Sequence, residues 1–231
     1  MIPAVARTGG ILRMHSTMLR LMTSLQPWRV LGWTLGLLGL ATLLGGCTAL
    51  QPPRAESTNL HVLGAAPMAM VARARRDVVL EVAPPRAWPG FDTPQMAYVR
   101  QPYELDYFVA NRWADTPARM LGPLLASALE QAGSFRAVVQ MPSAVLADLR
   151  IETELIRLQQ DFGTPPSRVE LAVRVQLIDV RGRRILASRL FEETERARSD
   201  DASGGVRAAN LALARLLDRV VDFCIEQSGA R

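Results

Sequence analysis

Two stretches in the second half of the chain alternate between apolar and polar residues. Apolar or β-branched side chains recur at every second position from Leu149 to Leu155 and again from Val169 to Leu177, with mainly charged residues between them. A period of two predicts strands that have one buried and one solvated face. A third strand, Ile185–Glu192, is expected after the turn residues Arg181-Gly182. The three stretches therefore predict an antiparallel meander.

Two other stretches have helical spacing. The first begins after the cap residue Thr116, which precedes a proline, and Gly133 is a natural stop. Pro123 lies within it, so either the helix is kinked there or a short first turn precedes the main helix. The second helix is predicted from Val206 to about Gln227. The polar segment Asp200–Gly205 precedes it and places acidic residues where they favour a helix N-terminus.

The first half of the chain has shorter elements. We expect a buried strand at Val78–Val82, a loop over 86–93, a hairpin of Met96–Arg100 and Glu104–Val109, a strand at Phe135–Met141, and one short strand candidate at 58–63. The predicted fold class is α+β: a mixed, largely antiparallel sheet with two main helices on one face. It forms a single domain after a signal peptide and a flexible tether.

The region before residue 48 has a different pattern. Arginines but no acidic residues precede Cys47, and Val30–Leu44 is almost wholly apolar. A positive region, a short apolar region and small residues at a cut site are typical of a secretory signal. Leu43–Cys47 resembles the lipobox of bacterial lipoproteins. That resemblance implies cleavage between Gly46 and Cys47, a diacylglyceryl group on the Cys47 thiol and an acyl group on the new amino terminus.

Two alternatives stay open for this region. An uncleaved membrane anchor is the first, although Val30–Leu44 is shorter than the roughly 18 apolar residues that suit a spanning helix. The second concerns the true start, which is Met1, Met14, Met18 or Met22. The predicted organisation is a signal peptide at 1–46, a lipidated tether with the short strand at 47–76, and one domain at 77–228.

The amino-acid composition excludes several classes of function. All 27 basic residues are arginine, so a Walker A phosphate loop and Schiff-base chemistry, which need lysine, are excluded. Without the four arginines of the signal, 23 arginines remain against 22 acidic residues. These charges are interleaved, whereas nucleic-acid proteins concentrate basic residues on one face. We therefore predict no nucleic-acid binding.

Cys224 follows Phe223 on an apolar helical face, so a buried thiol is expected.

No catalytic or metal-binding constellation is predicted. His61 is the only histidine after the signal, which leaves no triad or multi-histidine metal site. Glu152 and Glu154 have the spacing of an acid/base pair, but a solvated strand face explains them more simply. Asp200-Asp201 fits helix-end electrostatics, and Gly204-Gly205 does not follow a strand as a dinucleotide fingerprint would. We expect no cofactor beyond the covalent lipid.

A group of aromatic and polar residues is the better candidate for function. Tyr, Trp and Arg are common anchors of protein interfaces. The candidate partner-binding residues are Arg100, Tyr107, Asn111, Arg112 and Trp113, with Tyr98 beside them. Trp113 and Tyr107 have a structural alternative, which is to pack the helix onto the hairpin. Arg112 is the expected exposed contact.

An ordered set of segments in the domain has a family resemblance. The segments are Val78–Pro85, Phe91–Gln95, Tyr98–Arg100, Leu105–Phe108, Asn111–Ala114 with Pro117, Ala147–Ile151, Arg183–Ala187 and the Ala/Leu-rich last helix. This set resembles the ABC-type transport auxiliary lipoprotein family. The resemblance implies a periplasmic lipoprotein that works with an ABC transporter and an MCE-type protein to move lipids between the two membranes of a Gram-negative bacterium.

Further expectations follow from the resemblance. The chain would be a non-enzymatic subunit that docks to the periplasmic MCE-domain protein, with self-association as an additional option. Thr48, rather than aspartate, follows Cys47, which resembles the sorting pattern for the periplasmic leaflet of the outer membrane. The alternative function is a lipid-binding carrier with its own apolar pocket between helices and sheet. An envelope hydrolase lacks the residues it would need.

Overall fold

A computed structural model describes residues 57–64 and 75–229 of the chain. These residues form nine strands in one sheet and two helices. In chain order the elements are β1 (Asn59–His61), β2 (Arg76–Val82), β3 (Arg86–Ala87), β4 (Gln95–Val99), β5 (Asp106–Trp113), α2 (Pro117–Gln131), β6 (Phe135–Gln140), β7 (Leu149–Asp161), β8 (Arg168–Asp179), β9 (Arg184–Arg196) and α3 (Ala202–Ser228). The predicted signal at 1–46, the Gly46–Cys47 cleavage site and most of the predicted tether lie outside the described residues.

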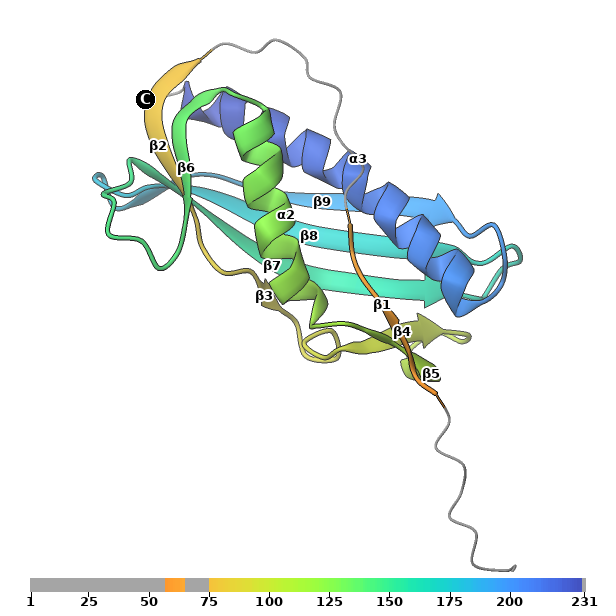
Figure 1. Ribbon diagram of the computed structural model, residues 1–231. Helices are drawn as coiled ribbons and strands as arrows, with labels where there is room; N and C mark the ends of the chain where they lie inside the picture. The colour runs from red at the N-terminus through yellow and green to blue at the C-terminus, as the bar shows by residue number, and fades with distance from the viewer. Residues whose placement is uncertain (1–56, 65–74, 230–231) are drawn as a thin grey trace, which may run out of the picture. The chain divides into compact units, whose positions relative to one another are not determined.

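Strand β7 is the centre of the sheet (Figure 1). One of its edges pairs with β8 in antiparallel register, from Leu149 opposite Asp179 to Asp161 opposite Arg168. Its other edge pairs in turn with three short parallel strands, β2, β3 and β4. Strand β9 continues the antiparallel meander beyond β8. At the far side, β5 pairs with β4, and β1 pairs with β5.

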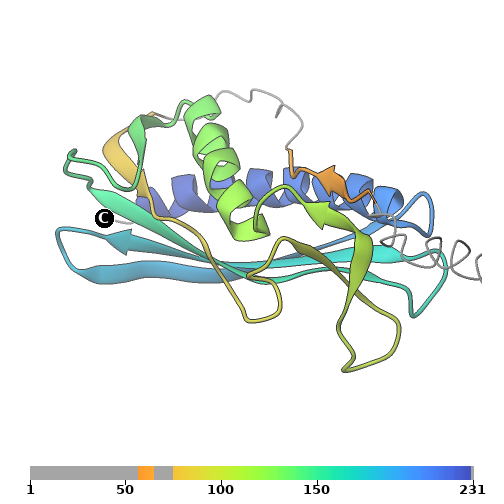
Figure 2. The same ribbon diagram turned by 60° about the horizontal axis from the view of Figure 1, so that its bottom comes forward.

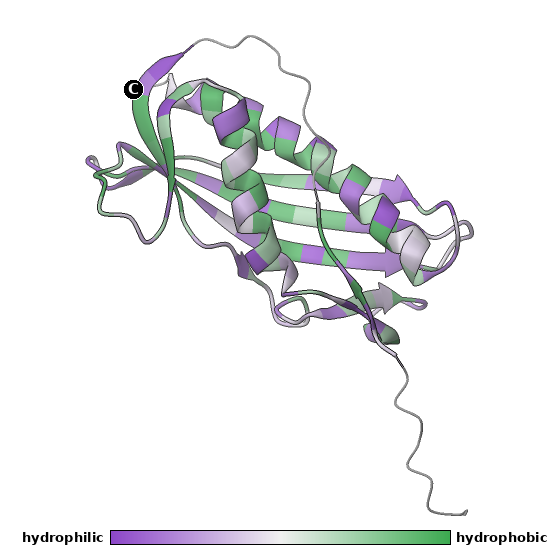
Figure 3. Ribbon diagram, in the orientation of Figure 1, coloured by the Kyte–Doolittle hydropathy of each residue, from purple (hydrophilic) through white to green (hydrophobic). Residues whose placement is uncertain are grey.

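Both helices cover the same face of the sheet (Figure 2). The alternating apolar and polar bands along β7 and β8 show why only one face is buried (Figure 3). Leu149, Ile151 and Leu177 are fully buried beneath the helices, and each such side chain contributes about 1.5–3 kcal/mol by leaving water. The predicted α+β class, with a mixed sheet and two helices on one face, is confirmed.

Strand β7 is longer than its alternating pattern predicts. The predicted strand ends at Leu155, but pairing with β8 continues to Asp161 after a bulge between Leu155 and Arg157. The bulge adds one residue and shifts the phase of the alternation. Leu158 and Gln160 then occupy the buried face that Leu155 occupies before the bulge. A strict period of two therefore detects only the first part of the strand.

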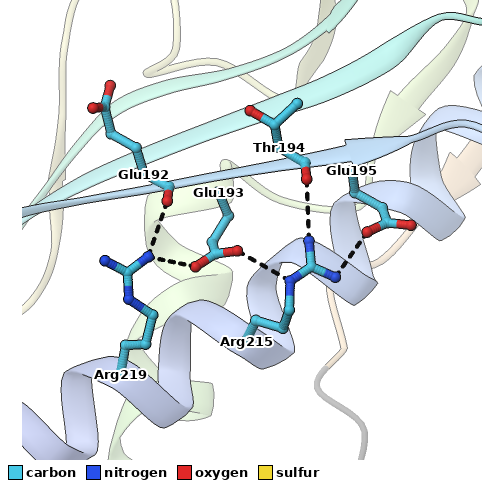
Figure 4. Close-up of polar contacts among 6 residues, drawn as sticks. All are labelled: Glu192, Glu193, Thr194, Glu195, Arg215 and Arg219. Carbon is cyan, nitrogen blue, oxygen red and sulfur yellow. Dashed lines mark hydrogen bonds and ion pairs between the residues drawn. The ribbon is translucent and has the colours of Figure 1, made fainter.

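Strand β9 also continues beyond its predicted end at Glu192, into a polar stretch. Glu193 and Glu195 lie on the face that bears α3, opposite Leu171 and Val169 of β8. Arg215 of α3 binds Glu193 at 3.0 Å and Glu195 at 2.7 Å (Figure 4). Arg219 of α3 binds Glu193 at 2.6 Å. These ion pairs let a polar sequence remain in the sheet.

The same two arginines also cover part of an open sheet edge. Among the described strands, β9 pairs only with β8, so its other edge has backbone groups available for a further strand. Arg215 donates to the carbonyl oxygen of Thr194 at 3.2 Å, and Arg219 donates to that of Glu192 at 3.1 Å (Figure 4). A planar guanidinium can serve carboxylates and a carbonyl together, because its donors form a fork.

Helix α2 begins and ends near its predicted bounds. The Thr116 hydroxyl accepts a hydrogen bond from the Arg119 amide at 3.4 Å, and Pro117 occupies the first turn. Pro123 lies within one continuous helix, so no separate short turn precedes the main helix. Its side chain is exposed.

Helix α3 begins at Ala202, four residues before the predicted start. The Asp201 carboxylate caps it by accepting from the Gly204 amide at 2.6 Å. Gly204 packs against the Ser199 carbonyl and Gly205 against the Gln160 side chain, and a β-carbon at either position would clash. In the sequence, the two glycines suggest that the helix has not yet begun. In the structure they lie in its first turn, where close packing leaves no room for a β-carbon.

Two further differences lie in the first half of the chain. The predicted loop over 86–93 contains the two-residue strand β3, which pairs with β7. Strand β5 reaches Trp113, although the predicted strand ends at Val109, because β1 pairs with residues 111 to 113. Neither of the two described helices is long and apolar enough to cross a membrane.

The edge cover on β9 leads to a prediction. Replacing Arg215 and Arg219 together by glutamine removes the ion pairs and frees the carbonyls of Glu192 and Thr194. We expect the free energy of unfolding to fall by about 1 kcal/mol, because partly exposed ion pairs contribute little each. Self-association through the freed edge should increase. Chemical denaturation and sedimentation velocity measure the two effects. Arg198→Gln is the control. If the double variant sediments like the wild type, the two arginines do not protect the edge of β9 from self-association.

The cap of α3 leads to a second prediction, which concerns pH. The hydrogen bond from the Gly204 amide, aided by that from the Ser199 hydroxyl, lowers the pKa of Asp201. Its contribution to stability is therefore present above the unfolded pKa and is lost as pH falls through the folded pKa. Asp201→Ala should lower Tm at pH 7, and the difference from wild type should narrow below about pH 4.

Thermal unfolding followed by circular dichroism across that pH range provides the test. Asp218→Ala is a matched control, because Asp218 is an exposed residue of the same helix away from its N-terminus. A constant difference between wild type and Asp201→Ala at all pH values would show that charge plays no part in the cap.

Candidate partner-binding site

The predicted partner-binding residues lie on the β4–β5 hairpin. Arg100 follows β4, and the other four residues belong to β5. The structure brings them to one end of the sheet but gives them different environments. Trp113 is only 4% exposed and belongs to the core. Its side chain contacts the interior, so it positions β5 and is not part of the surface.

Asn111 joins β5 to β1. Its side-chain oxygen lies 2.9 Å from His61 Nε2 and accepts a hydrogen bond from the Asn59 side-chain nitrogen Nδ2 at 3.4 Å. The Ala114 amide donates to the His61 carbonyl at 2.7 Å. Asn210 of α3 holds the segment after β1, because its side chain accepts from the Gly64 amide at 2.8 Å. The short strand expected at 58–63 is therefore an integral strand of the sheet.

Tyr107 fastens a loop to the hairpin. Its hydroxyl donates to the Gly90 carbonyl at 2.9 Å. Leu105 lies close by, since a β-carbon at Gly90 would be 3.0 Å from Leu105 Cδ2. Gly90 has φ +92°, a conformation that side chains rarely adopt. Tyr107 thus fixes the loop between β3 and β4.

The two arginines of the set are exposed. The Arg100 guanidinium lies 5.2 Å from the centre of the Tyr98 ring, within cation–π range. Arg112 is exposed, and within residues 57–64 and 75–229 no hydrogen bond or ion pair holds its guanidinium. In the sheet it lies opposite Leu60 of β1, which is also exposed, as is Val62. We call Leu60, Val62 and Arg112 the β1–β5 strip.

The sequence did not identify Leu60 and Val62 as surface residues. Apolar residues in a short strand normally indicate burial, and the partner strand of β1 lies some fifty residues away along the chain. One usable signal was that Asn59 and His61 alternate with these two residues. If the polar residues point to the helix side of the sheet, the apolar residues must point to the outer side.

The face of the sheet away from the helices is polar and largely self-neutralised. Arg150 binds Glu81 at 2.7 Å, and Arg174 binds Glu154 at 3.0 Å. Glu152 lies 3.9 Å from Arg86. The spacing of Glu152 and Glu154 thus reflects cross-strand ion pairing, in agreement with the solvated-face interpretation. Surface pairs of this kind stabilise a fold only weakly.

Cys224 and Asp200 are two titratable groups with a structural role. Cys224 is fully buried, and burial raises the pKa of its thiol. The Ser167 amide donates to the Asp200 carboxylate at 2.7 Å and lowers its pKa. Within the described part of the chain, no group of three or more His, Cys, Asp or Glu side chains could hold a metal ion.

The interior between helices and sheet is tightly packed. One gap, lined by residues that include Met96, Trp113 and Gln160, holds about 20 Å³. Another, lined by residues that include Leu121 and Leu213, holds about 10 Å³. Spaces of this size admit at most a water molecule. These two gaps in the core are therefore too small for an acyl chain. A third hollow, beside α2, holds about 200 Å³ and is lined by residues that include Pro85, Gly122 and Met141.

Solved structures share this fold. A crystal structure of a Xanthomonas campestris protein of the DUF330 family has a TM-score of 0.69 at 21% sequence identity, covering 74% of this chain and 98% of that one. The crystal structure of an uncharacterized protein has a TM-score of 0.59 at 12% identity, covering 73% of this chain and 99% of that one. At these identities the likeness concerns the fold alone. Among curated proteins, none matches the sequence.

The sequence model of the ABC-type transport auxiliary lipoprotein component matches residues 61–221. The match begins in β1 and ends in α3, so it spans nearly all the described elements. It therefore covers the whole hairpin and the last residue of β1, His61. The chain belongs to the ABC-type transport auxiliary lipoprotein family.

Proposed function

We propose that the protein is a non-enzymatic, lipid-anchored accessory subunit of an ABC/MCE-type system that moves lipids between membranes. The observation that carries this proposal is the family match over residues 61–221, which makes the chain an auxiliary component of ABC-type transport. The finer elements, which are the MCE partner, the lipid cargo and the outer membrane, are our inferences.

The anchor follows from the residues before the domain. Leu43–Cys47 has the composition of a lipobox, and an apolar segment with upstream arginines precedes it. Cleavage before Cys47 would leave this cysteine at the amino terminus with a diacylglyceryl and an N-acyl group. Because each buried methylene contributes about 0.8 kcal/mol, three acyl chains would hold the protein in the membrane. Thr48 favours the periplasmic leaflet of the outer membrane.

The β1–β5 strip is the proposed docking surface for the MCE-domain protein. Arg112 supplies an exposed guanidinium, and Leu60 and Val62 supply apolar area beside it. Interfaces combine apolar contact area with a few anchoring residues, among which arginine is enriched. The strip also lies on an edge strand, because β1 pairs only with β5 among the described strands. A partner strand could therefore add to the sheet there.

The chemistry of the described residues supports an accessory role. The carboxylates of Glu81 and Asp201 bind an arginine and a backbone amide, and the single cysteine among the described residues is buried. The small size of the two gaps in the core supports docking over carriage, because neither gap holds an acyl chain. The protein would act by its position and its partner.

Purification from native membranes tests the proposal. Affinity capture of the full chain from detergent-solubilised membranes should recover an MCE-domain protein together with subunits of its ABC transporter. Cys47→Ser should abolish acylation, as measured by mass spectrometry of the peptide that contains residue 47. Capture of the lipidated protein with no transporter component would contradict the proposed function.

Arg112 gives a sharper prediction within this experiment. Arg112→Glu should leave the fold unchanged within about 0.5 kcal/mol, because Arg112 is exposed and no described residue forms a hydrogen bond or ion pair with its guanidinium. If Arg112 is an interface anchor, the variant should lower the recovery of the MCE-domain protein by about tenfold or more.

Arg198→Glu is the matched control, because it makes the same charge change at an exposed residue between β9 and α3. Quantitative mass spectrometry of captured material compares the two variants. Equal recovery with Arg112→Glu, Arg198→Glu and wild type would remove the β1–β5 strip from the proposal.

A further inference from the structure

Exposed aromatic and aliphatic side chains gather on two loops beside the hairpin. Trp88, in the loop after β3, is 44% exposed, and Tyr103, at the turn between β4 and β5, is fully exposed. Leu105 follows two residues later and is 37% exposed. We call Trp88, Tyr103 and Leu105 the loop surface.

The two loops are fastened together. The hydrogen bond from the Tyr107 hydroxyl to Gly90 and the approach of Leu105 to the same glycine join them. The Trp88 amide also donates to the Leu155 carbonyl of β7 at 2.9 Å. Both loops extend from the sheet on the side away from the helices (Figure 2). The loop surface is therefore presented by a fixed part of the fold.

Tyr103 adopts a backbone conformation that disfavours it. Its φ is +70°, in the left-handed region where glycine and asparagine are preferred. Its ring is fully exposed, so no packing within the described fold compensates for the strain. Folding alone gives no reason for an aromatic residue here. The ring is better explained by a contact outside the chain.

The lipid anchor would lie near this end of the domain. Strand β1 begins at Asn59 and runs parallel to β5, so its start lies toward the end of β5 that follows the hairpin turn. Cys47 precedes Asn59 by twelve residues, and a fully extended segment of that length spans at most about 40 Å. A lipid on Cys47 would thus keep the start of β1 within about 40 Å of the membrane.

We propose that the loop surface touches the lipid bilayer in which Cys47 is anchored. Tryptophan and tyrosine are enriched at the membrane–water interface, where an apolar ring and a polar tip are both accommodated. The nearby Arg100 can reach lipid phosphates. A bilayer accepts side chains that project separately from loops, whereas a protein partner needs a continuous complementary patch. The inference rests on the lipid anchoring in the proposed function.

Tryptophan fluorescence of the mature, lipidated protein in vesicles tests this inference. Trp28 and Trp33 precede Cys47, so cleavage leaves only the exposed Trp88 and the buried Trp113. In vesicles of phosphatidylethanolamine and phosphatidylglycerol that contain brominated chains, Trp88 emission should fall about twofold, because its ring lies at the interface. Trp113→Phe isolates Trp88. If that variant does not fold, the difference between wild type and Trp88→Phe provides the same signal.

A second variant separates the loop surface from the anchor. Tyr103→Asn combined with Leu105→Ser removes the other apolar side chains and keeps a residue suited to positive φ. We expect Trp88 to be quenched less and to become more accessible to acrylamide, while the protein remains in the vesicle fraction. In Trp88→Phe, the emission of Trp113 should not respond to the brominated lipid.

Two results would overturn the inference. The first is equal Trp88 emission in brominated and ordinary vesicles, and the second is shielding of Trp88 only when the MCE-domain protein is added. Either result leaves the proposed function standing if transporter subunits are still captured. Absence of acylation on the amino-terminal peptide of the same preparation would instead show that the anchoring itself is wrong.

Discussion

The fold depends on the pairing of both edges of β7. One edge pairs with β8 along almost the whole strand, from Leu149 to Asp161. The other edge holds β2, β3 and β4 in succession, at residues 149 to 151, 154 to 155 and 159 to 161. Three short segments that would be marginal alone are thus placed on one long strand. The loops between them, including the one that bears Trp88, take their positions from that strand.

How much of this fold was predictable depends on the range of the contacts. The meander of β7, β8 and β9 was visible because each strand alternates and pairs with its neighbour in sequence. The parallel pairings were not visible, since β1 and β5 are separated by some fifty residues and neither has a strong pattern. The sequence pattern also predicts a loop where β3 lies, because β3 is short and pairs with the distant strand β7.

Three local differences between the predicted and the observed elements have identifiable physical causes. A bulge hides the second part of β7, because it reverses which residues face the core. Ion pairs with α3 keep the polar end of β9 in the sheet. Close packing against Ser199 and Gln160 accounts for the glycine pair in α3. In each case a tertiary contact outweighs the local propensity that the sequence displays.

The candidate site shows the same division. The sequence located the hairpin, and the structure separates its residues by role: Trp113 and Asn111 position β5, whereas Arg112 faces solvent. The environment of each side chain depends on β1 and on the loop at Gly90, which come from elsewhere in the chain. Sequence alone could therefore identify the region but not its exposed members.

The distribution of unmatched groups points to the same end of the sheet. The open face is neutralised by ion pairs between arginines and glutamates, and two arginines cover part of the β9 edge. With no lysine in the chain, these contacts all use the planar guanidinium, which can bind several acceptors at once. The β1–β5 end differs, because Leu60, Val62 and Tyr103 are exposed there and Arg112 has no partner among the described residues. Exposed apolar side chains also occur elsewhere, at Leu146 and Ile185. The β1–β5 end combines such side chains with an exposed arginine beside an edge strand, and the proposed docking rests on that combination.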